Sequence, residues 1–222
     1  MSLTLAVLRP EPGNAATAAR ATAAGYAVLR LPLFAVVPLD WSAPDVRDHD
    51  ALVLTSANTV RAAGAALASL ASLPVIAVGE QTAAAARAAG LSVAATGSSD
   101  AAALVALLAT RGIARALHLG GRERTPVGGV TRAIAVYASE PRAVAPADVA
   151  GLAGSVALLH SARAATRLGT LLDSAEVPRA RVTIGAFSAA IAAAAGSGWR
   201  AVAVAASPSD AALFAAIDAL GR

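Results

Sequence analysis

The chain has 222 residues, of which 57% are hydrophobic and 14% charged, and its formal net charge is +4. It contains no cysteine and no lysine, since all 18 basic residues are arginine. These absences exclude thiolate chemistry, disulfides, iron–sulfur clusters, Schiff-base enzymes and P-loop NTPases, which need a thiol or an amine. The three histidines, His49, His118 and His160, do not have the spacing of a metal-binding motif. The length allows one large domain or two smaller ones.

Short apolar runs alternate with alanine-rich stretches along the whole chain, which predicts β-strands followed by α-helices. The predicted strands are 3–8, 26–37, 51–55, 74–78, 91–95, 115–119, 132–137, 155–160, 181–184 and 200–205. The predicted helices are 14–24, 58–70, 81–89, 100–111, 162–172, 187–195 and 208–220. Because the strands are apolar almost throughout, we expect parallel sheets that helices cover on both faces.

Capping residues mark most of these helices. The expected N-caps are Asn14, Asn58, Asp100 and Ser209 or Asp210. The expected C-terminal glycines are Gly25, Gly90, Gly112 and Gly196.

An internal repeat indicates two domains of similar build. Residues 51–57 resemble 156–162, residues 78–83 resemble 184–189, and residues 99–102 resemble 209–212. These matches occur in order and at nearly constant offset, which chance similarity of alanine-rich helices would rarely produce. The sequence therefore predicts a duplicated α/β unit.

The strands divide unevenly, so the first domain must be discontinuous. The second repeat reaches the C-terminus with three strands, and the two strands before residue 38 complete it. We expect a first domain of residues 1–34 plus 141–222 and an inserted domain of 39–136, each with a five-stranded flavodoxin-like or Rossmann-like sheet. Residues 35–38 and 137–140 would form a two-strand hinge, with the ligand in the cleft between the domains.

No targeting signal is apparent. Pro10, Glu11 and Pro12 interrupt the first apolar run, and the two uncharged stretches, 62–79 and 182–199, are rich in Ala, Gly and Ser. We expect a cytoplasmic monomer without membrane contact. Aromatic residues make up only 3% of the chain, so its arginines do not form a nucleic-acid footprint, and a small anionic ligand fits better.

The residues resemble the uroporphyrinogen-III synthase family along nearly the whole chain. The match begins with Leu8-Arg9-Pro10-Glu11-Pro12-Gly13 and Leu31-Pro32-Leu33. It continues through residues 54–60 (LTSANTV), 77–83 (AVGEQTA), 120–123 (GGRE), Val136-Tyr137, Ile184-Gly185 and Ser188-Ala189. Each motif alone is weak, but their order and spacing are specific.

This resemblance implies a lyase that works without a cofactor or metal. Its reaction closes linear hydroxymethylbilane to uroporphyrinogen III, inverts ring D and releases water, as a step of heme biosynthesis. The substrate carries carboxylates on every ring, so recognition needs many anion-binding groups, which strand-to-helix turns can provide. Catalysis would then consist mostly of orienting the substrate.

Tyr137 matches the family's hinge tyrosine and is the candidate catalytic residue. We expect it at the end of the last strand of the inserted domain, where a phenol, protonated at neutral pH, could donate a proton to the departing hydroxyl. The alternative is a tyrosine that only packs at the hinge.

The candidate substrate-binding residues lie on turns that follow strands. In the inserted domain they are Ser56, Ala57, Asn58 and Thr82, and in the first domain Ser161, Ala162, Arg163 and Ser188. They would bind carboxylates through amides, hydroxyls and the Arg163 guanidinium, or act simply as helix caps. His160, Arg163 and Phe187 depart from the family pattern, so contacts in the first domain are open.

Arg9, Gly121 and Arg122 complete the candidate substrate-binding set. Either arginine could instead cap a sheet edge at the surface. Only residues 122–131 separate two predicted strands, so the helix expected there is shortened or lost. For the histidines we expect no catalytic role.

Two other functions stay open on the sequence alone. A catalytically silent homologue that binds a tetrapyrrole or another polyanion would share all of these features. A two-domain receptor for a sugar or nucleotide would share the architecture, but the chain lacks a Gly-x-Gly-x-x-Gly loop and aromatic platforms.

Overall fold

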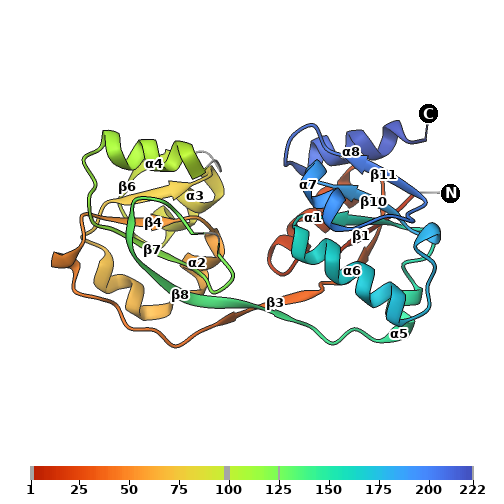
Figure 1. Cartoon of the computed structure of the whole chain (residues 1–222), viewed down its shortest axis with the longest axis horizontal. Coiled ribbons are helices and arrows are strands. Elements are labelled where there is room, and N and C mark those ends of the chain that lie inside the picture. Colours follow the sequence, from red (N-terminus) through yellow and green to blue (C-terminus); the bar gives the residue numbers. More distant parts are fainter. Residues whose placement is uncertain (1–2, 98–100, 125, 222) are drawn as a thin grey trace. The chain divides into compact units, whose positions relative to one another are not determined.

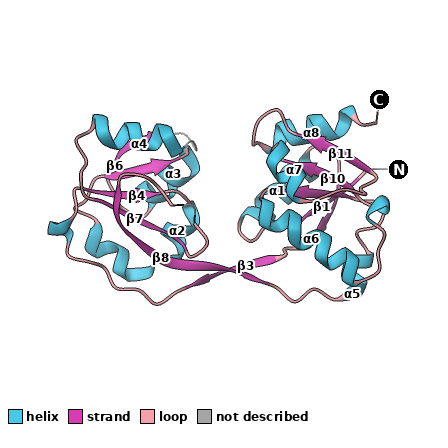
Figure 2. Ribbon diagram, viewed as in Figure 1, coloured by secondary structure: helices cyan, strands magenta, loops and turns pink. Residues whose placement is uncertain are grey.

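The structure, a computed structural model, describes residues 3–97, 101–124 and 126–221. The chain divides into two compact units, unit 1 (Met1–Ala35 and Pro141–Arg222) and unit 2 (Val36–Glu140). Unit 1 is assembled from both ends of the chain, and unit 2 is one continuous segment. Each unit contains a sheet with a parallel core and helices on both of its faces, so the predicted α/β class is confirmed (Figures 1 and 2).

The sheet of unit 1 has five strands in the order β11-β10-β9-β1-β2, and every neighbouring pair is parallel. The strands are β1 (Thr4–Val7), β2 (Ala27–Arg30), β9 (Val156–Leu159), β10 (Thr183–Ala186) and β11 (Ala201–Val204). The three central strands are almost completely buried, which explains their apolar sequences.

Two hydrophobic clusters join this sheet to its helices. On one face pack α5 (Pro146–Ala150), α6 (Ala162–Ser174) and α7 (Ala189–Ala194). On the other pack α1 (Gly13–Ala23) and α8 (Asp210–Ala219). A single-turn helix, η3 (Arg179–Arg181), precedes β10.

The sheet of unit 2 has the order β3-β8-β7-β4-β5-β6. Its strands are β3 (Phe34–Pro38), β4 (Ala51–Leu54), β5 (Val75–Val78), β6 (Val93–Gly97), β7 (Ala116–Gly121) and β8 (Val130–Pro141). The predicted five strands are therefore wrong for this unit, because β3 adds a sixth at the edge. β3 runs antiparallel to β8, since Arg142 N donates to Leu33 O and Leu39 N donates to Val136 O.

Helices also cover both faces of this second sheet. On one face lie α2 (Ala57–Ala62), η2 (Gly64–Leu70) and α3 (Glu80–Ala88), and on the other α4 (Ala101–Thr110). A short helix, η1 (Val46–Asp48), precedes β4. Among the described residues, no helix is both long and apolar enough to cross a membrane.

Two predicted elements are interrupted in the structure. The predicted strand 26–37 is two strands, because Pro32 lacks an N–H and the chain leaves the first sheet there. The predicted helix 58–70 becomes α2 and the 3-10 helix η2, since Gly64 has φ +63° and ends the α-helix. The predicted strand 91–95 instead begins at Val93.

Two of the predicted N-caps are wrong, and Asp100 lies outside the described residues. Pro12 occupies the N-cap of α1, while Asn14 is buried and its Nδ2 donates to Val7 O (2.7 Å). The N-cap of α2 is Ser56, which accepts from the N–H of Asn58. Ser209 is the cap of α8. The four predicted C-terminal glycines, Gly25, Gly90, Gly112 and Gly196, all have positive φ.

Candidate active site

Most of the predicted binding residues follow the carboxyl ends of parallel strands, where sheets of this kind bind ligands. In unit 1, Arg9 follows β1, Ser161 follows β9 and Ser188 follows β10. In unit 2, Ser56 follows β4, and Gly121 ends β7. Each unit therefore brings its own predicted residues to one edge of its own sheet.

The three predicted serines are helix N-caps, and each uses its oxygen as an acceptor. Ser161 Oγ accepts from Ala164 N (3.2 Å), Ser188 Oγ from Ile191 N (3.3 Å), and Ser56 Oγ from Asn58 N (3.2 Å). A hydroxyl that caps a helix still has its own proton, which it can donate outward. The capping role and a ligand-binding role are thus compatible at all three positions.

Arg9 is a half-buried guanidinium that lies against Gly13, where a Cβ would come within 2.5 Å of its Nε. Arg9 Nη1 donates to Thr17 Oγ1 (3.4 Å), and no carboxylate among the described residues is hydrogen-bonded to it. Burial lowers the pKa of Arg9, partly offset by Asp210, but arginine stays protonated. Its charge is therefore available to an anion.

A buried carboxylate beside Arg9 organises the same edge of unit 1. Asp210 Oδ2 accepts from Thr17 Oγ1 (2.8 Å) and from Arg20 Nε (2.8 Å), and Oδ1 lies 3.2 Å from His160 Nε2. The Asp210 and His160 side chains are only 5% and 7% exposed. The Phe187 ring packs edge-on against His160.

The charge states of this network follow from its contacts. Burial alone would raise the pKa of Asp210, but hydrogen bonds from His160, Arg20 and Thr17 outweigh it and lower the pKa well below its usual value. Burial lowers the pKa of His160 despite its bond to Asp210. At neutral pH a neutral His160 therefore donates its Nε2 proton to an ionised Asp210.

The first turn of α6 presents arginine on an aromatic surface. The Arg163 guanidinium lies 4.7 Å from the centre of the buried Phe34 ring, and the Arg167 guanidinium lies 5.6 Å from it. Arg163 and the neighbouring Ala162 are exposed. Stacking on Phe34 limits the motion of Arg163, and the first-turn amides of α6 lie beside it, so this turn can hold a carboxylate.

In unit 2, a shift of register places Tyr137 opposite Gly121. Gly120 pairs with Ala135 but Gly121 pairs with Tyr137, so β8 carries one extra residue at this point. Val136 and Tyr137 then pack against the same hydrophobic cluster. The phenol is half-buried, and in the described part of the chain its hydroxyl has no hydrogen-bond partner. Tyr137 thus lies within the strand rather than at its predicted end.

The remaining candidates of unit 2 differ in what they offer a ligand. Arg122 donates to Glu123 Oε1 (2.9 Å) and Glu140 Oε1 (2.8 Å), and these contacts raise its pKa. Its charge is therefore already offset. Thr82 is only 5% exposed, whereas Ala57 and Asn58 are half-buried on the turn after β4.

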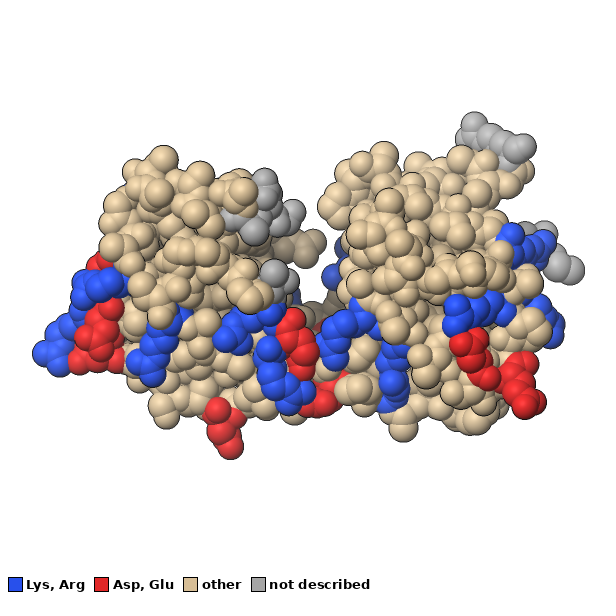
Figure 3. All heavy atoms as spheres, viewed as in Figure 1, with Lys and Arg blue, Asp and Glu red and all other residues tan. Residues whose placement is uncertain are grey.

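Some charged side chains elsewhere on the surface form ion pairs, such as Arg47 with Asp45 and Arg115 with Asp50. Figure 3 shows basic and acidic side chains next to one another on the face drawn, and none over α4, whose ten residues are uncharged. Among residues 3–97, 101–124 and 126–221, no three His, Asp or Glu side chains come together as a metal would require.

The network around Asp210 was not predicted from the sequence, which indicated Asp210 only as a possible helix cap. The signal is hard to find, because Thr17 and Arg20 lie about 190 positions away from it. The contact of Arg163 with Phe34 has no local pattern either. The loss of a helix between β7 and β8 is confirmed, since residues 122–129 form only turns and loop in the described part.

Comparisons with known proteins agree with this architecture. Residues 15–215 match the family described as Uroporphyrinogen-III synthase HemD. The crystal structure of uroporphyrinogen-III synthetase from Helicobacter pylori is similar, with a TM-score of 0.66 and 16% identity over 99% of this chain and 100% of that one. A mutant uroporphyrinogen III synthase from Thermus thermophilus has a TM-score of 0.55 and 19% identity over 99% of both chains. No curated protein matches in sequence. The chain belongs to the uroporphyrinogen-III synthase family of tetrapyrrole biosynthesis.

Proposed function

We propose that the protein closes hydroxymethylbilane to uroporphyrinogen III, with inversion of ring D and loss of water, and that Tyr137 is its general acid. The observation that carries this proposal is the Tyr137 phenol, fixed against Gly121 and without a partner for its hydroxyl among the described residues. A proton donor with no competing acceptor suits a departing hydroxyl.

Binding would use the anion-binding groups at the carboxyl edge of each sheet. In unit 1 these are the Arg9 guanidinium, the Ser161 and Ser188 hydroxyls, and the first turn of α6 with Ala162 and Arg163. In unit 2 they are the Ser56 hydroxyl and the turn through Ala57 and Asn58. Arg122 and Thr82 support the proposal less, because Arg122 is already paired and Thr82 is buried.

The proposed reaction balances without an added reagent. The Tyr137 phenol protonates the hydroxymethyl oxygen, the carbon–oxygen bond breaks as the pyrrole nitrogen supplies its electron pair, and water leaves. The substituted carbon of ring D attacks the resulting azafulvene cation and forms a spiro intermediate. The original bond from that carbon to the methylene of ring C then breaks, and the unsubstituted carbon of ring D attacks the azafulvene cation formed on ring C, which closes the macrocycle with ring D inverted. The ring proton finally released restores the phenol. The protein's main contribution is to hold the two ends of the substrate in the reacting geometry.

Family membership favours this enzyme over a catalytically silent homologue, which no observation supports specifically. The proposal uses residues of a single chain, so a monomer suffices.

The test is a coupled assay with freshly generated hydroxymethylbilane in which the type III and type I isomers are separated. The wild-type protein should yield type III, and Tyr137→Phe should lower turnover at least about tenfold. Tyr26→Phe is the matched control, since the Tyr26 hydroxyl bonds to Asp218 Oδ1 at 2.6 Å, away from the candidate residues. Only type I product from the wild type would contradict the function, and near-normal turnover of Tyr137→Phe would remove Tyr137 from the mechanism.

A further inference from the structure

The missing helix between β7 and β8 leaves a cavity in unit 2. Two parallel strands are usually joined by a crossover of a dozen or more residues with a helix, but here only residues 122–129 join them. Beneath this connection lies a cavity of about 400 Å³, a size at which small molecules bind. We call it the crossover pocket, and the residues that matter for its chemistry are His118, Arg124, Val127, Val130 and Ala133.

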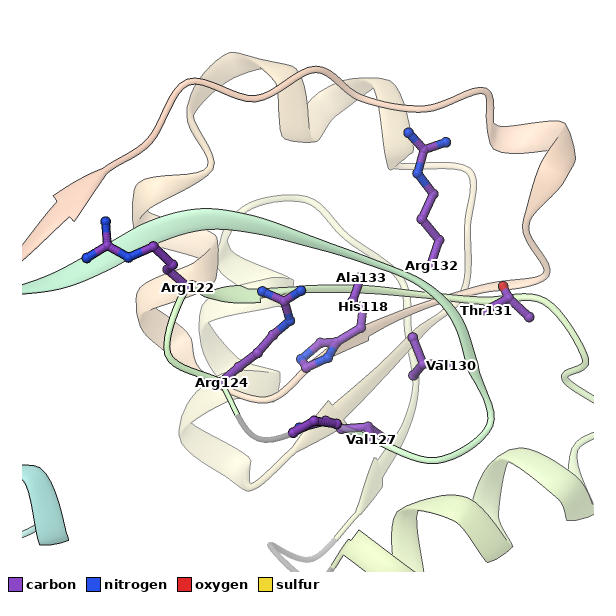
Figure 4. A pocket seen from close by; sticks show the side chains of 9 residues that line it. His118, Arg122, Arg124, Val127, Val130, Thr131, Arg132 and Ala133 are labelled. Carbon is purple, nitrogen blue, oxygen red and sulfur yellow. The ribbon is translucent and has the colours of Figure 1, made fainter.

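The crossover pocket contains a cation that has no counter-ion among the described residues. Arg124 is half-buried, its side chain lies over Gly120, and its Nη1 donates to Gly121 O (3.1 Å). In Figure 4 its guanidinium points inward over His118, whereas Arg122 and Arg132 point away. No carboxylate lines the pocket. Because charges removed from water are normally paired, a bound anion would stabilise this half-buried guanidinium.

His118 forms a neutral polar wall of the pocket. It is 1% exposed, and its Nε2 lies 3.1 Å from Thr55 Oγ1. Burial, with a smaller effect of the Arg124 charge, lowers its pKa to about 4, so it is uncharged at neutral pH. The anion would therefore meet one guanidinium and one neutral imidazole, which is fewer donors than a phosphate usually takes but enough for a two-oxygen group.

Pro126, Val127, Val130 and Ala133 form the apolar part of the lining, and Arg122, Thr131 and Arg132 add polar groups to it. Val127 and Val130 pack against the cluster under α4, and Ala133 lies on β8 beside His118. Alkyl carbons next to the anionic group would be buried against these side chains.

We propose that the crossover pocket binds a carboxylate carried on a short alkyl chain, with Arg124 on the carboxylate and Val127 and Val130 on the chain. Such a group can belong to a free short-chain acid or to an arm of a larger acidic molecule. The crossover pocket shares Arg122 with the proposed substrate-binding set, but the proposal does not depend on the synthase reaction, because binding alone tests it.

Binding can be followed by NMR through the imidazole signals of the three histidines. The signal that is missing from the spectrum of His118→Gln is that of His118. Butyrate at constant ionic strength should shift the His118 signal saturably, and butanamide, its neutral isostere, should not. Arg124→Gln should weaken butyrate binding at least about tenfold, as expected for loss of a charge-assisted pair. Val127→Phe, which fills the pocket, should also abolish the shift. Arg111→Gln, an exposed arginine of the same unit, is the control.

A titration with uroporphyrin, whose carboxylates are on short alkyl arms, distinguishes the two possible sources of the carboxylate, a free acid and an arm of a larger molecule. A His118 shift with uroporphyrin that depends on Arg124 would assign the carboxylate to a tetrapyrrole arm, and a shift with butyrate alone would assign it to a free acid. Equal binding of butanamide, or unchanged butyrate binding in Arg124→Gln with native secondary structure, would overturn the proposal. The same variants are also measured in the synthase assay, so that a failure of the pocket proposal can be distinguished from a failure of the proposed function.

Discussion

The Tyr137 ring lies directly on Gly121, so closely that a Cβ at position 121 would come within 2.9 Å of two ring carbons. The same two residues face each other across β7 and β8, and the N–H of the next residue, Arg122, donates to Tyr137 O (2.8 Å). The glycine therefore sets where the phenol can lie.

Gly121→Ala should lower turnover about tenfold or more, because a small displacement of a catalytic group is costly. A double-mutant cycle in the coupled assay tests the cause. If Gly121 acts through the phenol, adding Gly121→Ala to Tyr137→Phe should cost little more than Tyr137→Phe alone. Additive losses would show that Gly121 acts in another way.

If Arg9 binds the substrate as proposed, Arg9→Gln should raise the KM for hydroxymethylbilane about tenfold or more with a smaller effect on kcat, because it removes the proposed charge-assisted contact to a carboxylate. Arg200→Gln is the matched control, since Arg200 is exposed and precedes β11 at the amino edge of the same sheet. An unchanged KM in Arg9→Gln would exclude Arg9 as an anchor.

Asp210→Ala should destabilise the protein by about 2 kcal/mol, measured by urea unfolding. It leaves Arg20, Thr17 and His160 without their acceptor, although the Arg20 side chain is half exposed and can reach water, which reduces the loss. Asp173→Ala removes an exposed partner of Arg179 and should destabilise the protein much less than Asp210→Ala does. Equal effects of the two variants would argue against the network around Asp210.

Stability should fall on acidification between pH 6.5 and 4. Burial first, and Arg124 second, lower the pKa of His118 from 6.5 to about 4, so in this range the unfolded chain binds a proton that the folded chain does not. The contribution of neutral His118 is complete above pH 6.5 and is lost as the pH falls to 4, by about 3 kcal/mol in total.

His118→Gln should make this pH dependence shallower. It should not abolish it, because the pKa of His160 is lowered too and acts in the same direction. Unfolding curves at a series of pH values would measure both effects. A slope unchanged in His118→Gln would show that His118 is not buried in its neutral form.

Much of the fold could be predicted because its signals are local. Apolar strands such as Val156–Leu159 and the glycines that end helices, such as Gly25, can be recognised within a few residues. The pairing of β3 with β8, and hence the sixth strand, depends on residues about 100 positions apart and leaves no local pattern.

The candidate site was predictable in part for the same reason. Serine before a helix marks a cap, so Ser56, Ser161 and Ser188 could be placed on turns. What these side chains meet could not be predicted, because Arg163 stacks on Phe34 and Arg122 pairs with Glu140 only once the sheets have formed. The role proposed for Tyr137 rests on the family resemblance, while the register shift that places it opposite Gly121 is a property of the folded strands.

The division of unit 1 between the two ends of the chain has a consequence for biosynthesis. When β1 and β2 leave the ribosome, β9, which lies next to β1 in the finished sheet, has not yet been translated. At usual elongation rates the N-terminal segment waits about 10 s for that neighbour, with its apolar strand exposed. Meanwhile unit 2 emerges as an uninterrupted stretch, so it can fold before unit 1 is complete.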